Sequence, residues 1–310
     1  MTREREGILL CLLAAVAYCT TPILAKYAYA ASVGVMTLLI VRYAVAVVIF
    51  WTIVRVRTVS LPPRPIALRG FAVGLLATSV QVFFFATALT RIDAALGSLL
   101  LYTYPAMVAL GAFFSGQERP NARRIAARLI ASVGVVLVLG GADRGRWDTI
   151  GVLCALASAL AYTIYLLISH SLLATAAPLP LAALGSSGAA LTFLIVGAAT
   201  GQLSVDFARW GWGPVIGMAL VSVVATLASL AGVVRVGPTT TSIVTMMETP
   251  LTVGLAYLAL GERLLPVQLA GGALVLAAVV LLQARRVAVT SASVNTPEGG
   301  PNEAAPAAPL

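Results

Sequence analysis

Glu248 is the one acidic residue that lies well inside an apolar stretch of this sequence. Placing a charge near the centre of a bilayer costs on the order of 2.5 to 3.5 kcal/mol on insertion scales, so such a residue normally faces a cavity, pairs with another group or is protonated. We predict that Glu248 either binds an ammonium group or carries a coupling proton. A protonated or hydrogen-bonded structural carboxyl is the alternative interpretation.

Arg42 is the basic counterpart of Glu248, because it also lies within an apolar stretch. Counted from the same side of a membrane, Arg42 is about eight residues deep and Glu248 about twelve, which is a difference of roughly 6 Å at about 1.5 Å per residue. An ion pair between the two is therefore possible, and Arg42 could also hold a carboxylate. Alternatively, its side chain reaches towards the nearer interface or bonds the carbonyls of a helix end.

Aromatic, thioether and amide side chains occur at similar depths. Tyrosine combines an apolar ring with a hydroxyl group, methionine has a soft and adaptable side chain, and a glutamine in an apolar stretch needs a polar partner. We predict that these residues line a pocket for partly apolar solutes, with ordinary core packing as the alternative. The predicted lining residues are Tyr18, Gln81, Tyr102, Tyr104, Tyr162 and Met247.

Pro105 and Pro250 lie near the middle of two apolar stretches. A proline inside a helix removes one backbone hydrogen bond and clashes with the carbonyl four residues earlier, which produces a kink. Because the two prolines occupy equivalent places in the two halves of the chain, we predict that they act as hinges or form cavity walls. A simple packing kink is the alternative.

The elements that position these residues follow from composition. Hydrophobic residues make up 60% of the chain and charged residues 10%, and the mean hydropathy is +0.99. These values predict a polytopic membrane protein. The net charge of +9 arises from arginine clusters between apolar runs, so the positive-inside rule accounts for it and no nucleic-acid partner is expected.

A helix needs about 20 apolar residues to cross the hydrocarbon core. Ten stretches of the chain meet this requirement, and they predict an all-α fold. The predicted spans are Ile8–Tyr27, Val35–Val54, Phe71–Thr90, Ala94–Phe114, Ile125–Gly141, Ile150–Leu172, Leu181–Thr200, Pro214–Val234, Thr239–Leu260 and Val267–Gln283.

The chain contains an internal repeat. Ala94–Arg119 and Thr239–Arg263 are both apolar stretches with a central proline and a closing Glu-Arg, and Gly7–Tyr18 matches Gly151–Tyr162 at nearly the same offset. Two units of five helices are therefore predicted. The predicted units are residues 1–145 and residues 146–286, followed by a disordered cytoplasmic tail at residues 287–310.

Arginine placement predicts the orientation of these units. Most arginines fall on the side that holds both termini, so we expect both termini to be cytoplasmic. Because five is an odd number, the second unit enters the membrane from the opposite side and the two repeats are inverted. Inverted repeats around a central cavity are typical of secondary transporters that work by alternating access, although duplication could also simply build a stable bundle.

With the repeated apolar stretches, their central prolines and their closing Glu-Arg pairs, the chain resembles the EamA-type family of the drug/metabolite transporter superfamily as far as about Gln283. The resemblance implies ten helices around a central cavity and transport of small metabolites. Within the family, the chain is most similar to the YddG-like amino-acid exporters in length and in its neutral, aromatic cavity residues. The matching residues are Lys26, Leu39–Tyr43, Pro105, Gln117–Arg119, Pro250 and Gly261–Arg263, whereas Tyr18-Cys19 departs from the aromatic-Gly pair that is frequent in the family.

Three functions remain open at this stage. The first is export of aromatic or neutral amino acids, or of related amphipathic metabolites, across a bacterial inner membrane. The second is export of drugs or organic cations, and the third is a passive channel or a membrane-embedded partner protein. An intramembrane enzyme is not expected, because the chain has one histidine and neither an HExxH nor a GxSxG motif.

No cofactor or metal is expected, since the three cysteines lack ligand spacing. The expected partners are a small-molecule substrate and the lipid bilayer, and a monomer is compatible with the sequence.

Overall fold

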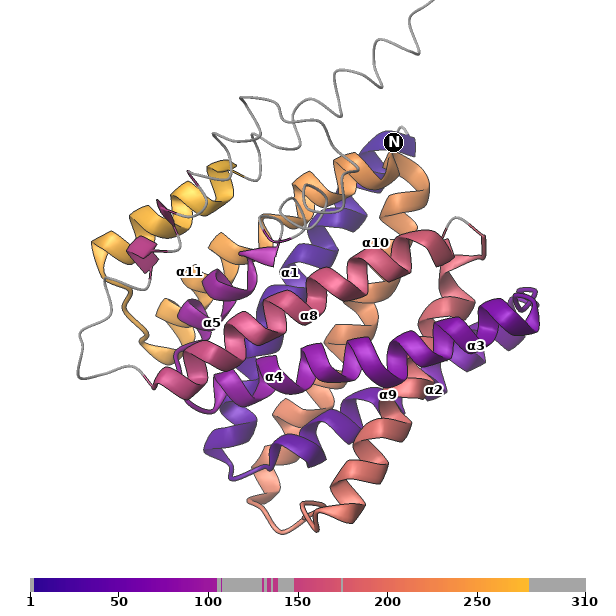
Figure 1. Cartoon of the computed structure of the whole chain (residues 1–310), viewed down its shortest axis with the longest axis horizontal. Coiled ribbons are helices and arrows are strands. Elements are labelled where there is room, and N and C mark those ends of the chain that lie inside the picture. Colours follow the sequence, from indigo (N-terminus) through magenta and orange to yellow (C-terminus); the bar gives the residue numbers. More distant parts are fainter. Residues whose placement is uncertain are drawn as a thin grey trace, which may run out of the picture.

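The computed structural model describes residues 3–104, 107, 130, 133–134, 136–138, 148–173 and 175–278. Within these ranges the regular secondary structure is helical (Figure 1). The labelled elements are α1 (Arg3–Ala30), α2 (Val35–Val56), α3 (Arg64–Val73), the π-helical turn η1 (Gly74–Thr78), α4 (Ser79–Leu89), α5 (Ala94–Leu101), α8 (Thr149–Leu173), α9 (Pro178–Ala199), the 3₁₀ turn η2 (Arg209–Gly211), α10 (Trp212–Thr245) and α11 (Glu248–Leu260).

Six helical runs in the described part of the chain are long and apolar enough to cross a bilayer, and they correspond to six of the ten predicted spans. The second half of the fourth predicted span and most of the fifth lie outside the described residues, and the tenth is represented by the helix Pro266–Ala278. The protein is therefore a polytopic membrane protein. The six runs are Glu4–Ala30, Val35–Val56, Arg64–Leu89, Thr149–Ser169, Pro178–Ala199 and Arg209–Gly237.

The ninth predicted span, Thr239–Leu260, is divided rather than continuous. α10 extends past a kink at Gly237, where φ is 80°, and ends at Thr245, and α11 begins at Glu248 after a turn. Pro250 explains the interruption, because it has no N–H to donate to the carbonyl of Met246. The N–H of Thr249 bonds that carbonyl instead, at 3.3 Å.

The same interruption occurs in the first repeat. α5 ends at Leu101, and Tyr102 and Thr103 form a turn, one residue further along the repeat than the turn at Met246 and Met247. Pro105, to which we would attribute this turn by analogy, lies outside the described residues. Interrupted spans at equivalent positions expose backbone polar groups, which a membrane protein tolerates only beside a cavity or another protein segment.

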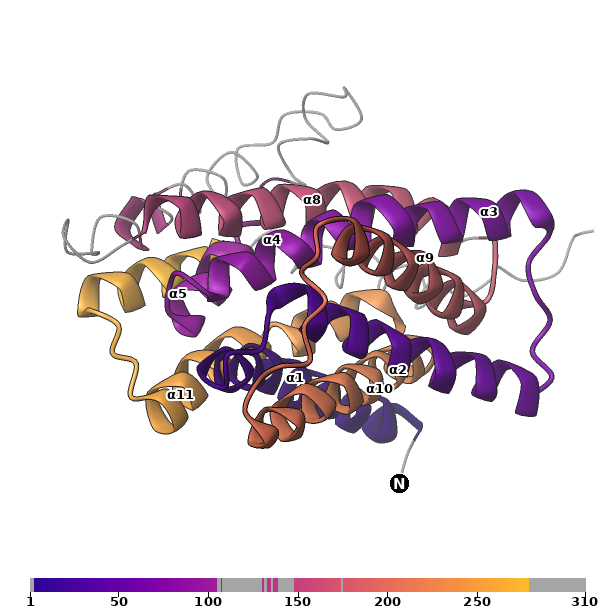
Figure 2. The ribbon, with the colours of Figure 1, turned by 90° about the horizontal axis from the view of Figure 1, so that it is seen from below.

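Each repeat packs its first helix against the third span of the other repeat. α1 lies along α10, and α8 lies along α4 (Figures 1 and 2). Equivalent glycines meet equivalent residues: a Cβ added to Gly7 would lie 2.8 Å from the Cβ of Arg235, and one added to Gly151 would lie 2.9 Å from the Cβ of Arg91. The two helix pairs are therefore built on the same contact.

Close glycine packing also joins the third span to α9. The carbonyl of Gly185 lies where a Cβ on Gly74 would have to be, and Gly188 approaches the backbone of Phe71 similarly closely. Gly74 begins η1, and the Ser79 hydroxyl donates to the Gly74 carbonyl at 2.8 Å. Such small-residue contacts allow two helices to pack closely in a membrane, where apolar burial alone provides little driving force between helices.

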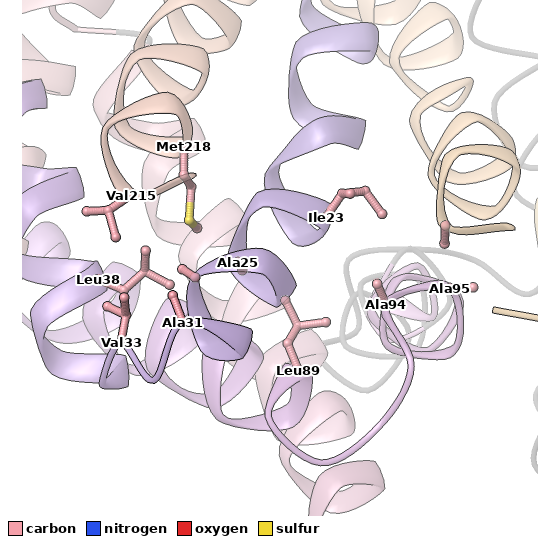
Figure 3. Packing of buried hydrophobic residues seen from close by; sticks show 12 residues of the cluster. Ile23, Ala25, Ala31, Val33, Leu38, Leu89, Ala94, Ala95, Val215 and Met218 are labelled. Atoms are coloured by element: carbon pink, nitrogen blue, oxygen red, sulfur yellow. The ribbon is translucent and has the colours of Figure 1, made fainter. Parts of the chain in front are cut away.

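An apolar cluster fills one end of the bundle. Its residues come from the end of α1, the start of α2, the end of α4, the starts of α5 and α10, and α11 (Figure 3). We call it the Ile23 cluster, and its buried members are Ile23, Ala25, Ala28, Ala31, Val33, Leu38, Leu89, Ala94, Ala95, Val215, Met218 and Ala256. The small alanines let the helix ends converge, so this end is densely packed.

Candidate functional site

A cavity of about 470 Å³ lies inside the described bundle. Both repeats line it, with Tyr18 from the first and Tyr162 from the second, and it extends to Leu173 and Pro178 beside the α8–α9 connection. That connection is at the opposite end of α8 from Asp148. Asp148 pairs with Arg91, which follows Leu89 of the Ile23 cluster in the chain. The cavity thus reaches one end of the bundle, and the Ile23 cluster packs the other.

Glu248 lies in the wall of this cavity, at the first residue of α11. Its side chain is half-buried, and Oε2 is 3.0 Å from the hydroxyl of Tyr102. The same hydroxyl is 3.3 Å from the carbonyl of Thr245, so its single proton is shared between two acceptors. A carboxylate in the first turn of a helix is also favoured by the helix dipole. The structure thus places Glu248 beside a cavity and a hydrogen-bond partner.

Arg42 lies in the same cavity wall, on α2. Its guanidinium carbon is 5.5 Å from the centre of the Tyr43 ring, which is a cation–π distance. Among the described residues, no carboxylate lies within 4.0 Å of Arg42, so the ion pair with Glu248 that depth alone allowed is not formed. The cavity therefore carries one acidic and one basic side chain that are not neutralised by each other.

Four tyrosines form a continuous chain of ring contacts along the wall. The Tyr102 and Tyr104 rings are 5.7 Å apart, Tyr104 meets Tyr162 edge-to-face at 4.7 Å, and Tyr162 stacks on Tyr165 at 5.7 Å. Such geometries are the favourable ones for aromatic pairs. The chain of rings crosses from the residues that follow α5 in the first repeat to α8 in the second and begins beside Glu248.

Two polar pairs connect helices that line the cavity. The Gln81 amide donates to the hydroxyl of Ser158 at 3.2 Å, and that hydroxyl donates to the Gln81 carbonyl at 2.8 Å, which joins α4 to α8. The Tyr18 hydroxyl is 3.0 Å from that of Thr226, which joins α1 to α10. Gln81 thus finds the polar partner that it needs inside a membrane in Ser158, a buried serine on the neighbouring helix.

The structure brings together most of the predicted lining residues but not all of them. Met247 lies on the turn before α11 and is 48% exposed outside the cavity wall, so its expected place in the lining is corrected. A turn residue follows no helical face, and the sequence offset alone could not show this. Pro250 is exposed in the first turn of α11, and Pro105 lies outside the described residues.

Sequence reasoning missed several residues of the wall. Tyr165 is three residues after Tyr162 and therefore on the same face of α8, a spacing that could have identified it. Thr21 and Pro22 also line the cavity, on α1. The Thr21 hydroxyl is buried and has no hydrogen-bond partner among the described residues.

Comparison with known proteins gives two matches to the same family. The EamA-like transporter family matches residues 5–140 and, a second time, residues 149–283. The chain belongs to this family. The double match agrees with the internal repeat, and it establishes that the protein is a transporter of the drug/metabolite superfamily rather than an enzyme.

A curated relative and a solved structure illustrate the proteins that the chain resembles. "Uncharacterized transporter YcbK" from Bacillus subtilis (strain 168) is 25% identical over 280 residues, which are 86% of this chain and 88% of that protein. A crystal structure matches 92% of this chain and 99% of its own with a TM-score of 0.64 at 21% identity, which supports the fold alone.

Proposed function

We propose that this transporter exports aromatic or neutral amino acids, or related amphipathic metabolites, by alternating access. The observation that carries the proposal is the pair of unneutralised charges, Arg42 and Glu248, in the wall of one aromatic cavity. An amino acid has a carboxylate, an ammonium group and an apolar side chain. Arg42 would hold the carboxylate, Glu248 the ammonium group, and the tyrosine chain the side chain.

The end that the cavity reaches supports the proposed direction of transport. The α8–α9 connection is on the same side as the start of α1 and the exposed residues Arg55 and Arg64, and arginines favour the cytoplasmic side. On this assignment the cavity opens inward and the Ile23 cluster forms the outer closure. Loading from the cytoplasm of a bacterial cell, with both termini inside, is consistent with an exporter in the inner membrane.

Alternating access requires two repeats that can exchange roles. Support comes from the fourth and ninth spans, which are equivalent in the two repeats, because the start of α5 in the fourth span lies against Glu262 at the end of the ninth. This antiparallel relation is what inverted repeats of five helices would produce. The interrupted spans next to the cavity are the places at which such a rearrangement would bend, with Pro250 and Pro105 as the proposed hinges.

A second candidate function is export of organic cations. It is favoured by one specific observation, namely that Glu248 is the only acidic residue in the described cavity wall. In that case Glu248 alone would meet the charge, and Arg42 would have no substrate contact.

Counterflow in proteoliposomes tests the two candidates. Purified protein is loaded with unlabelled solute and given labelled amino acids or one organic dication, at matched and unmatched pH. Saturable amino-acid exchange is the expected result, and movement of the dication alone would contradict the proposal. A response to the pH gradient that disappears in Glu248→Gln would assign the coupling proton to this carboxyl.

Arg42→Gln distinguishes the candidates at the level of the site. Loss of a charge-assisted contact is expected to raise the KM for amino acids about tenfold or more. Arg55→Gln is the matched control, since Arg55 lies on the same helix but is exposed at its end. Equal KM values in both variants would remove the carboxylate-binding role of Arg42.

A further inference from the structure

The helices around the cavity divide into two groups that are equivalent in the two repeats. α1 packs against α10 and α11, and α8 packs against α4 and α5. The cavity lies between the groups, because Tyr18 and Leu230 line it from the first group and Tyr165 and Leu166 from the second. For the protein to open at the end that the Ile23 cluster packs, one group must therefore move relative to the other at that end.

Glu262 joins the two groups at the packed end. It follows α11, and its carboxylate oxygens accept hydrogen bonds from the backbone N–H groups of Ala94 and Ala95 at the start of α5, both at 2.9 Å. The first N–H groups of a helix have no acceptor within that helix. Glu262 thus supplies, from one group, the acceptors that a helix of the other group lacks.

Tyr29 makes a second connection between the groups. It lies on α1 and packs against the Ile23 cluster, and its hydroxyl donates to the carbonyl of Ala86 at 3.0 Å. Ala86 is in the last turn of α4, where the carbonyls lack an N–H partner within the helix. Both contacts therefore use backbone groups at helix ends, and water can replace either side chain when the groups separate.

We propose that Glu262 and Tyr29 form a latch that holds the packed end closed, and that both contacts break when the transporter opens towards that side. This inference uses the alternating access of the proposed function but not the identity of the solute. The ion pair of Arg91 and Asp148 is near the same end, but it joins the end of α4 to the start of α8 within one group. It is therefore not part of the latch and stays formed in both states.

Two cysteine reporters distinguish the two ends of the protein. Leu89→Cys places a thiol in the Ile23 cluster, where the leucine is 1% exposed, and Ser229→Cys places one in the cavity wall. Each reporter is introduced after Cys11, Cys19 and Cys154 have been replaced by alanine. The rate of labelling by a charged maleimide, measured on the full-length protein in lipid nanodiscs, shows how often each thiol meets water.

Glu262→Ala should raise the labelling rate at position 89 about 3- to 30-fold, which corresponds to the usual cost of losing a helix cap. The rate at position 229 should stay the same or fall, because the cavity closes at its own end when the packed end opens. Tyr29→Phe should act in the same direction with a smaller effect, since it removes one hydrogen bond. Asp148→Asn is the matched control and should leave both rates unchanged.

The reporters also separate a latch from a merely structural contact. An increase at both positions in Glu262→Ala would mean that the whole bundle has loosened, and it would overturn the inference. An unchanged rate at position 89 in both Glu262→Ala and Tyr29→Phe would overturn it as well.

The latch and the proposed function fail in different experiments, because labelling requires no solute. If position 89 labels faster in Glu262→Ala but no amino acid is exchanged across the membrane, the latch stands and the export of amino acids is wrong. If amino acids are exchanged while the labelling rates do not change, the proposed function stands and the latch is wrong.

Discussion

Glu262 caps the helix that begins at Ala94. Its Oε1 accepts a hydrogen bond from the backbone N–H of Ala94 at 2.9 Å, and Oε2 accepts one from the next N–H at 2.9 Å. The carboxylate thus satisfies two of the four free N–H groups at the start of α5, and its charge complements the helix dipole. Because Glu262 follows α11, this contact joins the equivalent spans of the two repeats beside the Ile23 cluster.

Replacing Glu262 by alanine should destabilise the protein by about 0.5 to 2 kcal/mol, the usual cost of losing a side-chain cap. Glu262→Gln should cost less, since the amide oxygen can still accept one of the two bonds. Thermal unfolding of the purified protein in detergent measures both. Arg263→Ala, an exposed neighbour, is the control, and a Glu262→Ala variant as stable as that control would contradict a capping role.

The ion pair between Arg91 and Asp148 should make stability depend on pH. The Arg91 guanidinium donates to the Asp148 carboxylate at 2.6 Å, and the backbone N–H of Gly151 adds a further bond, which together lower the pKa of Asp148. A lowered pKa stabilises the folded state fully above the ordinary aspartate value of about 3.9 and loses this effect as the pH falls through the folded value.

Asp148→Asn should therefore be less stable than the wild type between about pH 5 and pH 7, and the difference should shrink below about pH 4. The effect is expected to be small because both side chains are partly exposed. Unfolding measured across this pH range checks it, with Asp206→Asn as the control. A difference that is constant with pH would show that the contact does not act through charge.

Much of the helical fold could be predicted from the sequence, because apolar length alone identifies a membrane span. Most ends of the helices α1, α2, α8 and α9 lie within a few residues of the predicted span ends. The division of the ninth span was not predicted. An apolar run continues through the break at Met246, and only the chemistry of Pro250 indicates a disturbance, without indicating a turn.

The candidate site could be predicted in part. Glu248 and Arg42 were identified because charges are costly in lipid, and both lie in the cavity wall. Their separation depends on side-chain directions and helix tilt, which residue counting cannot give, so the ion pair was not foreseeable either way. Met247 was misplaced because repeat equivalence transfers position along the chain but not the direction of a side chain.

The contact between Gly74 and Gly185 should be intolerant of any added side chain. A Cβ at position 74 would collide with the carbonyl of Gly185, and a backbone group cannot move aside without shifting α9. Gly74→Ala should therefore cost about 1 to 3 kcal/mol, as overpacking usually does. Gly254→Ala is the matched control, since nothing lies within 4 Å of a Cβ there.

Unfolding of both glycine variants in the same detergent provides the comparison. We expect Gly254→Ala to be neutral or slightly stabilising, because alanine favours a helix. Equal stability of Gly74→Ala and wild type would mean that α9 and the third span are not packed at the distance described.

The hydroxyl of Tyr102 should matter for transport through its bond to Glu248. Tyr102→Phe keeps the ring in the aromatic chain but removes the only side-chain donor to this carboxylate among the described residues. Losing a hydrogen bond to a charged group is expected to lower exchange about 10-fold or more at limiting solute, since the carboxylate must then be solvated or protonated. Tyr257→Phe, outside the cavity wall, should leave exchange unchanged.

The direction of the change identifies the role of Tyr102. If the hydroxyl orients an ionised Glu248 towards an ammonium group, the KM should rise while the maximal rate changes little, because uniform binding is lost. If Glu248 instead carries a proton, the phenylalanine variant should shift the pH dependence of exchange, because the hydroxyl no longer stabilises the ionised form. Unchanged KM, rate and pH dependence would leave the Tyr102 and Glu248 contact as a purely structural one.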